Sequence, residues 1–208
     1  VLSLTYNTDR IEGSTLSLAE TAAILFNDIS LPNKSLVEQL EAKNHQAALE
    51  YLFRYLTTSR KIDEALILKL HGMLMNGILG DAGMYRRHAV RIVGANVPTA
   101  NYLKVPVLVK KLIEKIARNP KDSIAHMVRV HAEFEKIHPF SDGNGRIGRL
   151  AMNAMALRKN IAPPMILQEN RRFYFTYLQK AQQTGDTTLL EDFICDAISG
   201  SYKILERK

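Results

Sequence analysis

The chain has 208 residues, 46% of them hydrophobic, and carries 28 Lys and Arg residues against 21 Asp and Glu residues. These values indicate one globular domain with a single buried core, and no stretch approaches the roughly 18 consecutive apolar residues of a membrane helix. The net charge of +7 suits an anionic ligand. It would also suit a nucleic acid, but no repeat, low-complexity tract or nucleic-acid-binding motif accompanies it.

A single cysteine, Cys195, can form no internal disulfide. We therefore expect a reducing compartment, the cytoplasm. No signal-peptide pattern stands at the start. The chain opens on Val1 rather than Met, so a preceding segment would be invisible in this sequence.

The N-terminal region predicts helices separated by clear start and stop signals. A short first helix should end at Gly13, because Ser17 and Glu20 form a capping box in front of the next apolar run. A second capping box, Ser35 with Glu38, begins a long helix that we interpret as scaffold.

A further helix should begin after Asp63, which is a suitable N-cap, and run to Asn76. His45 and His71 lie inside these helices. No Cys, Asp or Glu partners recur at metal-site spacing, so we interpret both as hydrogen-bonded helix residues.

Residues 77–100 interrupt the helical pattern. Three glycines in residues 77–83 stop it, and alternating, β-branched residues 87–94 followed by a turn predict one β-hairpin. A lone hairpin is marginal, so it should lean on the helices, and its open edge could pair with an extended peptide. A simple connector is the alternative, and the residues alone do not decide between the two.

Two more helices should follow, one with Pro106 in its first turn and one capped by Asp122. The second carries apolar residues at helical spacing and ends at His138. Its two internal histidines, His126 and His131, are five apart and so lie about 140° apart around the helix, which argues against a metal pair.

Residues 138–149 read His-Pro-Phe-Ser-Asp-Gly-Asn-Gly-Arg-Ile-Gly-Arg. A turn of Gly143, Asn144 and Gly145 that opens into a helix points backbone N–H groups at one spot, where the helix dipole favours an anion. Arg146 and Arg149 are three apart, so both should emerge on one face and bind phosphate oxygens.

Two more residues of this segment suit nucleotide chemistry. Asp142 can hold Mg²⁺ against the same phosphates, and His138 can take a proton at neutral pH. Taken singly, each residue also has an ordinary interpretation at a helix end. Taken together they predict a site for a nucleotide phosphate chain, with a spacing different from that of a Walker A loop.

The C-terminal region predicts a helix near residues 169–183 and a last helix capped by Thr188 and Glu191. Residues 171–177 mix aromatic side chains with positive charge. They form either a core stripe, which the residues alone favour, or a surface on which a base stacks.

Residues 138–149 resemble the signature of the Fic family, His-Pro-Phe-x-Asp/Glu-Gly-Asn-Gly-Arg-x-x-Arg, at every defined position. The resemblance implies an all-α, Fic-like helical bundle with one small β-hairpin flap. We therefore expect a single Fic domain over residues 1–208, with an inhibitory helix segment at 1–16, the flap hairpin at 86–100 and a signature helix-loop-helix at 123–158.

The resemblance also implies an activity, transfer of AMP from ATP to a Ser, Thr or Tyr hydroxyl of a protein, which is called AMPylation. The target would be another protein or the chain itself, and family members often self-associate, so a homodimer stays open. Removal of AMP by a hydrolase on the same fold is one alternative. A basic nucleic-acid-binding adaptor without transferase activity is another.

The resemblance assigns roles to particular positions. His138 would be the general base, and Asp142 would hold Mg²⁺. The residues expected to bind ATP are Asp142, Gly143, Asn144, Gly145, Arg146 and Arg149 at the phosphates, with Tyr174, Phe175 and Gln182 near the adenine. The flap residues expected to align the target are Arg91, Ile92, Val93 and Gly94.

An inhibitory element is implied at the start of the chain. Thr8, Glu12 and Gly13 resemble the family's Ser/Thr-x-x-x-Glu-Gly/Asn motif, in which the glutamate pairs with the second signature arginine, here Arg149. The residues themselves indicate that Glu12 needs a cation, because it faces the negative end of its helix dipole. An exposed acid on a frayed terminus is the alternative.

Overall fold

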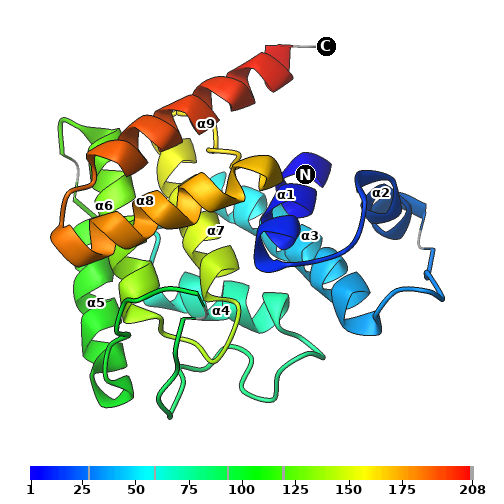
Figure 1. Ribbon diagram of the computed structural model, residues 1–208, viewed down its shortest axis with the longest axis horizontal. Coiled ribbons are helices and arrows are strands. Elements are labelled where there is room, and N and C mark those ends of the chain that lie inside the picture. The colour runs from blue at the N-terminus through cyan, green and yellow to red at the C-terminus, as the bar shows by residue number, and fades with distance from the viewer. Residues whose placement is uncertain (28, 59, 93, 119, 207–208) are drawn as a thin grey trace.

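A computed structural model of the chain describes residues 1–27, 29–58, 60–92, 94–118 and 120–206. These residues form a helical bundle with no strand among them (Figure 1), which confirms the predicted all-α class. The helices are α1 (Leu2–Glu12), α2 (Leu18–Asn27), α3 (Leu36–Leu56), α4 (Glu64–Leu74), α5 (Val105–Ile116), α6 (Ser123–Ile137), α7 (Asn144–Leu157), α8 (Arg171–Thr184) and α9 (Thr188–Glu206), with short 3-10 helices η1 (Tyr102–Lys104) and η2 (Gln168–Asn170). None of the described helices combines the length and the apolar character needed to cross a membrane.

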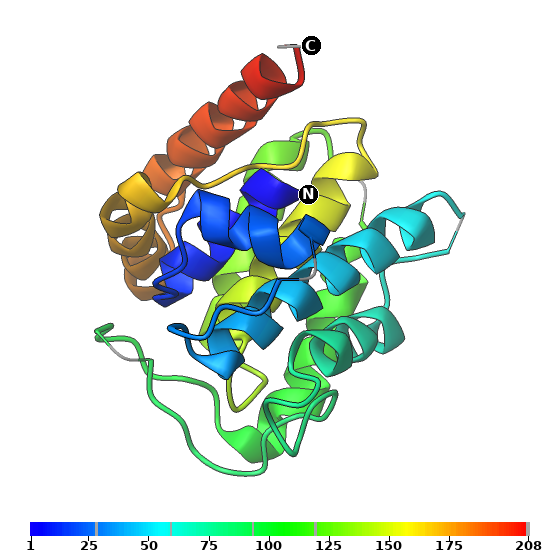
Figure 2. The same cartoon turned by 90° about the vertical axis from the view of Figure 1, so that its right-hand side faces the viewer.

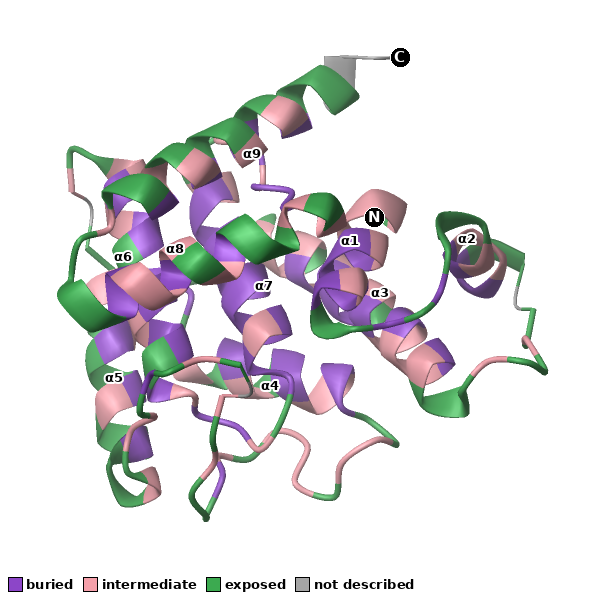
Figure 3. Cartoon of the chain, viewed as in Figure 1, coloured by how far each residue is buried: buried purple, intermediate pink, exposed green. Residues whose placement is uncertain are grey.

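The centre of the bundle is α7, against which α1, α3, α4 and α6 pack. Figure 3 shows it largely buried, and only Gly145 and Leu157 within it are not. α6 packs tightly against it at Gly148, where a Cβ atom would collide with the Glu135 carboxylate. The signature loop, residues 138–143, joins these two helices, so the core itself fixes where the loop lies.

α1 ends where the sequence predicts. Gly13 follows it with φ 108°, the left-handed conformation that favours glycine, and its N–H donates to the Arg10 carbonyl at 3.2 Å. Ile11 is fully buried in the main core, and α1 packs against α2, α3 and α7. The alternative of a frayed N-terminal segment is therefore wrong.

Most predicted helix starts are confirmed. Ser17 and Glu20 form the reciprocal capping box of α2, with hydrogen bonds of 2.8 and 3.2 Å. Asp63 and Asp122 accept main-chain hydrogen bonds at the starts of α4 and α6. Pro106 lies in the first turn of α5.

Two predicted capping boxes are not formed as expected. Ser35 caps α3, but Glu38 reaches away from it and accepts the Thr15 N–H at 2.5 Å. The loop between α1 and α2 presents this amide to the carboxylate, and a charge-assisted hydrogen bond forms there instead. At α9, Glu191 accepts from the Thr187 hydroxyl, so the cap lies one residue earlier than predicted.

His45 and His71 are hydrogen-bonded helix residues, as predicted. His45 Nδ1 lies 2.9 Å from Thr5 Oγ1. His71 Nδ1 accepts the Gly83 N–H at 2.9 Å, so Nε2 carries the proton and donates to the Asp142 carbonyl at 3.1 Å. His71 thus supports the signature loop from α4.

The predicted β-hairpin over residues 86–100 is not formed in the part of it that the structure describes, and Val93 lies outside the described residues. The segment is an open loop at the edge of the bundle (Figure 2). The Thr99 hydroxyl donates to the Val90 carbonyl at 2.8 Å, and the Arg86 guanidinium binds carbonyls in both arms. Side-chain donors therefore join the arms in place of a strand ladder, which in a lone hairpin is marginal. We keep the name flap for residues 86–100.

Candidate active site

The signature loop is held closed by its own side chains. Phe140 is fully buried and stacks on His71, with the ring centroids 3.7 Å apart. Asn144 accepts the Phe140 N–H at 2.8 Å and donates to the Phe140 carbonyl at 2.9 Å. The Asn144 side chain therefore serves the loop, which leaves its backbone N–H for the predicted phosphate contact.

The N-terminus of α7 is open to an anion. Gly143 precedes the helix with φ 77°, and no described side chain caps it. The first N–H groups of a helix lack intrahelical partners and lie at the positive end of the dipole. A Cβ atom on Gly143 would come 3.0 Å from Met75 Sδ, and one on Gly145 would collide with the Glu12 carboxylate. The left-handed backbone of Gly143 favours glycine there, and the contact at Gly145 shows that Glu12 lies beside the anion position.

His138 has the geometry of a general base. It ends α6 in the left-handed conformation, with φ 51°. Its Nδ1 lies 3.2 Å from the Glu135 carbonyl, which can only accept, so Nδ1 carries the proton. Burial lowers the pKa of His138 below its usual value. The imidazole is therefore neutral at pH 7, with an unprotonated Nε2.

Asp142 is the exposed acid of the loop, with 62% of its side chain accessible. Oδ1 accepts the Gly143 N–H at 2.6 Å, and Oδ2 lies 3.8 Å from Arg146 Nη2. In the described part of the chain no three His, Cys, Asp or Glu side chains gather into a metal site. A Mg²⁺ ion that accompanies a nucleotide needs only one or two carboxylates beside the phosphates. The accessible Asp142 carboxylate at the open end of α7 fits such an ion.

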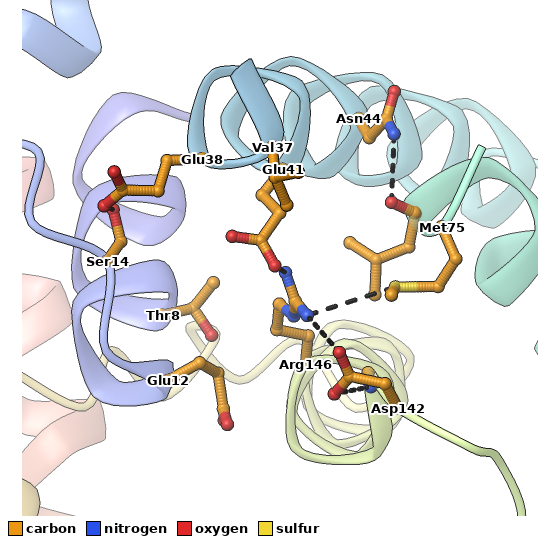
Figure 4. Close-up of polar contacts among 12 residues, drawn as sticks. Thr8, Glu12, Ser14, Val37, Glu38, Glu41, Asn44, Met75, Asp142 and Arg146 are labelled. Carbon is orange, nitrogen blue, oxygen red and sulfur yellow. Dashed lines mark hydrogen bonds and ion pairs between the residues drawn. The ribbon is translucent and has the colours of Figure 1, made fainter. Parts of the chain in front are cut away.

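Arg146 extends from α7 to a position between Glu41 of α3 and Asp142 of the loop (Figure 4). Its side chain is 3% exposed, and Nη1 donates to Glu41 Oε1 at 2.7 Å. Nη2 contacts Met75 Sδ at 4.0 Å. The Glu41 pair fixes Nη1, while Nη2 lies on the side of Asp142, where the predicted phosphate contact of Arg146 would be made.

Arg149 is held by both residues of the N-terminal motif. Its Nη2 donates to Glu12 Oε1 at 2.6 Å and to the Thr8 carbonyl at 3.3 Å, while Nε donates to the Thr8 hydroxyl at 2.5 Å. The side chain is only 6% exposed, against 32% for Glu12. The predicted pairing of Glu12 with Arg149 is thus present, and Thr8 adds two hydrogen bonds that the motif did not predict.

Comparison with known proteins identifies the family. Residues 61–156, which contain the signature loop and most of α7, match the model of the Fic/DOC family. The chain carries a Fic/DOC family domain. It is 32% identical over 197 residues to Protein adenylyltransferase Fic of Aedes aegypti, and 31% identical over 196 residues to the protein of that name in Drosophila ananassae. Each match covers 92% of this chain and 39% of the relative, so the chain spans well under half the length of these Fic proteins.

Solved structures of Fic proteins have the same fold. Fic-1 (residues 134–508) from C. elegans superposes with a TM-score of 0.89 at 27% identity, over 99% of this chain and 62% of that one. A Fic-domain protein from Bacteroides thetaiotaomicron superposes with a TM-score of 0.83 at 21% identity, over 97% of this chain and 85% of that one. The N-terminal helices outside the Fic/DOC match are therefore part of an arrangement that other Fic structures share.

A cavity of about 350 Å³ lies between α8, the flap and Glu135 of α6, which is three residues before His138. Phe175 and Gln182 of α8 line it, as do Ile92 and Gly94 of the flap. Tyr174 is instead fully buried behind this wall, and its hydroxyl lies 2.8 Å from His131 Nε2. Two of the three residues predicted near the adenine thus face one cavity together with the flap, and Tyr174 belongs to the core.

The sequence did not predict four residues that surround the Fic site. Arg86 donates to a main-chain carbonyl of the flap, and Glu41 accepts from Arg146. Asp9 and Glu135 are buried carboxyls, and burial raises the pKa of Asp9 to about 7 and that of Glu135 to about 8. The role of each of these four residues depends on a neighbour on another element, so the local sequence does not reveal it. Glu135 alone had a local signal, because it lies three residues before His138.

Proposed function

We propose that this Fic domain transfers AMP from ATP to a Ser, Thr or Tyr hydroxyl of a protein and releases pyrophosphate. The observation that carries the proposal is a neutral imidazole, His138, at the open N-terminus of α7. Similarity to proteins named adenylyltransferases supports transfer over removal of AMP and over nucleic-acid binding.

His138 is the general base of the proposed reaction. A hydroxyl has a pKa far above 7, so it becomes a useful nucleophile only if its proton is taken during attack. Nε2 of His138 accepts that proton as the hydroxyl oxygen bonds to the α-phosphorus. The bond from the α-phosphorus to the bridging oxygen breaks, and pyrophosphate leaves with the electron pair. General-base catalysis of this kind contributes roughly 10²- to 10⁴-fold in rate.

The open end of α7 binds the phosphates. The backbone N–H groups that follow Gly143 point toward the α-phosphate, where negative charge is best stabilised by fixed dipoles. Asp142 would hold Mg²⁺, which would neutralise charge on the leaving phosphates when bound with ATP. Arg149, once free of Glu12, supplies a cation to the γ-phosphate.

Substrate recognition uses the cavity between α8 and the flap. The adenine stacks on Phe175, with Gln182 as the polar group of the pocket. The flap, with its exposed Arg91, binds the target backbone and presents the hydroxyl to His138. Because Cys195 is a free cysteine, the cytoplasm is the proposed location. The chain itself is one of the proposed targets.

The described conformation is the inhibited one. Glu12 and Thr8 hold Arg149, so that arginine is withheld from the γ-phosphate. ATP that binds without this contact has its α-phosphorus out of line for attack, and a misplacement of about 1 Å can cost on the order of 100-fold in rate. α1 is therefore an inhibitory element of the domain.

Intact-mass measurement tests the proposed activity. The Glu12→Gly variant, incubated with ATP and Mg²⁺, should gain the mass of one or more AMP groups. The Glu12→Gly, His138→Ala double variant should gain none, while its ATP affinity in titration calorimetry stays within a few-fold. Transfer by a folded double variant at the rate of the single variant would exclude His138 as the base.

A further inference from the structure

Arg86 is the largest fully buried side chain of the described residues, at 2% exposure, and it is the first residue of the flap. It forms no ion pair with any described carboxylate; its guanidinium is surrounded by main-chain carbonyls instead. A buried cation without a counter-ion is costly unless its donors are satisfied. The position of these carbonyls therefore indicates what the residue does.

The donors of Arg86 reach two separate parts of the proposed site. On one side Nε donates to the His138 carbonyl at 2.7 Å, and Nη2 lies 3.4 Å from the Ile137 carbonyl. On the other side Nη1 donates to His88 at 2.7 Å and Nη2 to Ala100 at 2.6 Å. The Arg86 guanidinium thus donates hydrogen bonds to the end of α6 and to both arms of the flap.

The end of α6 needs such a partner for physical reasons. The last carbonyls of a helix have no intrahelical donor and lie at the negative end of its dipole. His138 also adopts the left-handed conformation, which is strained for a non-glycine residue and persists only where its surroundings enforce it. Arg86 supplies donors to Ile137 and His138, and its own N–H donates to the Pro139 carbonyl at 3.0 Å. The cation therefore stabilises the turn that aims the imidazole.

We propose that Arg86 is a positioning residue that couples the flap to the general base. The same guanidinium fixes the backbone of His138 and both flap arms. A target bound along the flap is therefore held at a fixed position relative to Nε2 of His138. This inference rests on the proposed function, since it assigns the roles of base and flap. Lysine cannot replace the residue, because its three donors lack the planar, forked geometry that reaches four carbonyls.

The charged groups around His138 add a second signature. Arg86 lowers the pKa of the imidazole, whereas Glu12 and Asp142 raise it. Removing the Arg86 cation should raise the pKa of His138, and the acid side of the rate profile should move to higher pH. A purely structural arginine elsewhere would have no such effect.

The chain contains a matched control. Arg158 also binds main-chain carbonyls, that of Leu56 at the end of α3 and those of Thr58 and Arg60 in the loop between α3 and α4. It lies just past the C-terminus of α7, whereas the signature loop precedes the N-terminus. Arg158→Gln should cost stability as Arg86→Gln does, without acting on the base or the flap.

The test compares Arg86→Gln, Arg86→Lys and Arg158→Gln in the Glu12→Gly background. NMR titration of the His138 ring should give a raised pKa in Arg86→Gln, a value near that of the parent in Arg86→Lys, and no change in Arg158→Gln. Hydrogen exchange of the flap amides of Ala95 and Ala100, which donate to main-chain carbonyls, should accelerate about 10-fold or more in both Arg86 variants, as expected for loss of a charge-assisted hydrogen bond. Self-labelling should fall about 100-fold in both, with ATP affinity within a few-fold.

The outcomes separate the inference from the proposed function. If the Glu12→Gly parent transfers no AMP, the proposed function fails, and the titration and the exchange still decide the coupling. Unchanged His138 pKa and unchanged flap exchange in both Arg86 variants would overturn it. Equal loss of ATP binding and of transfer would also overturn it, because that is the behaviour of a general folding defect. If Arg86→Gln does not fold, Arg86→Lys alone decides through flap exchange and rate.

Discussion

Release of Arg149 is the most quantitative expectation of the structure. Glu12→Gly removes the carboxylate that accepts from Arg149 Nη2 at 2.6 Å. A hydrogen bond between charged groups contributes about 1.5–3 kcal/mol. Arg149 must leave this bond to reach a phosphate, so its removal should lower the barrier by that amount. At 1.36 kcal/mol per tenfold, self-AMPylation should rise roughly 10- to 100-fold.

The two hydrogen bonds from Arg149 to Thr8 survive in Glu12→Gly, so the gain should not be complete. Glu12→Gln, which keeps the side-chain length and removes the charge, should give an intermediate rate. Arg149→Ala should be weakly active with or without Glu12, because the arginine is needed once it is released, so the two changes should be strongly non-additive.

Initial rates of self-labelling at matched ATP and Mg²⁺ measure this effect. Glu133→Gln is the control, since it removes an ion pair of similar length, 2.7 Å between Glu133 and Lys115, whose side chains are 36% and 41% accessible. Such a pair contributes about 0–1 kcal/mol to stability and has no contact with the site. Equal rates for wild type and Glu12→Gly would refute the inhibitory role of α1.

Three further changes test other parts of the site. In wild type as well as in the Glu12→Gly background, His138→Ala should abolish transfer while calorimetry still detects ATP binding, and a transferring, folded variant would exclude the base. Asp142→Ala should remove the Mg²⁺ dependence of ATP binding in the same calorimetric assay, and an unchanged dependence would place the ion on another residue. The pKa of Asp9 is raised to about 7 by burial, so the folded state holds this proton more tightly than the unfolded state and the free energy of unfolding falls as pH rises from about 4 to 7. Asp9→Asn should therefore gain up to about 4 kcal/mol relative to wild type between pH 4 and pH 8 in urea unfolding, and a pH-independent difference would contradict the assigned titration.

Local chemistry explains what could be predicted from the sequence about the fold. Gly13, Asp63 and Asp122 act within one helical turn, so their patterns suffice to mark helix ends. Glu38 failed as a capping residue because a loop amide from elsewhere in the chain competes for it. The flap pattern correctly indicated non-helical backbone. The two arms are joined by Arg86 and not by strand pairing, and its contacts span up to 52 residues of sequence.

In the site, too, the contiguous residues could be predicted from the sequence and most contacts between distant residues could not. The loop from His138 into α7 is contiguous, so its chemistry is visible in the sequence, and the family resemblance supplied the link from Glu12 to Arg149 across 137 residues. The partner of Arg146 could not be predicted, because Glu41 lies 105 residues away on α3 and no pattern joins the two. Burial of Tyr174 was equally hidden, since an aromatic residue among charges suits both a core and a stacking surface.

The position of the transferred phosphorus tests the central claim most directly. Glu12→Gly should be incubated with Mg²⁺ and ATP labelled with ³²P at either the α or the γ phosphate, and the protein-bound label counted after denaturation. The account predicts stable label from α-³²P-ATP and none from γ-³²P-ATP, because the bond between the α-phosphorus and the bridging oxygen breaks. Label retained from γ-³²P-ATP, or none from either nucleotide, would contradict adenylyl transfer by this domain.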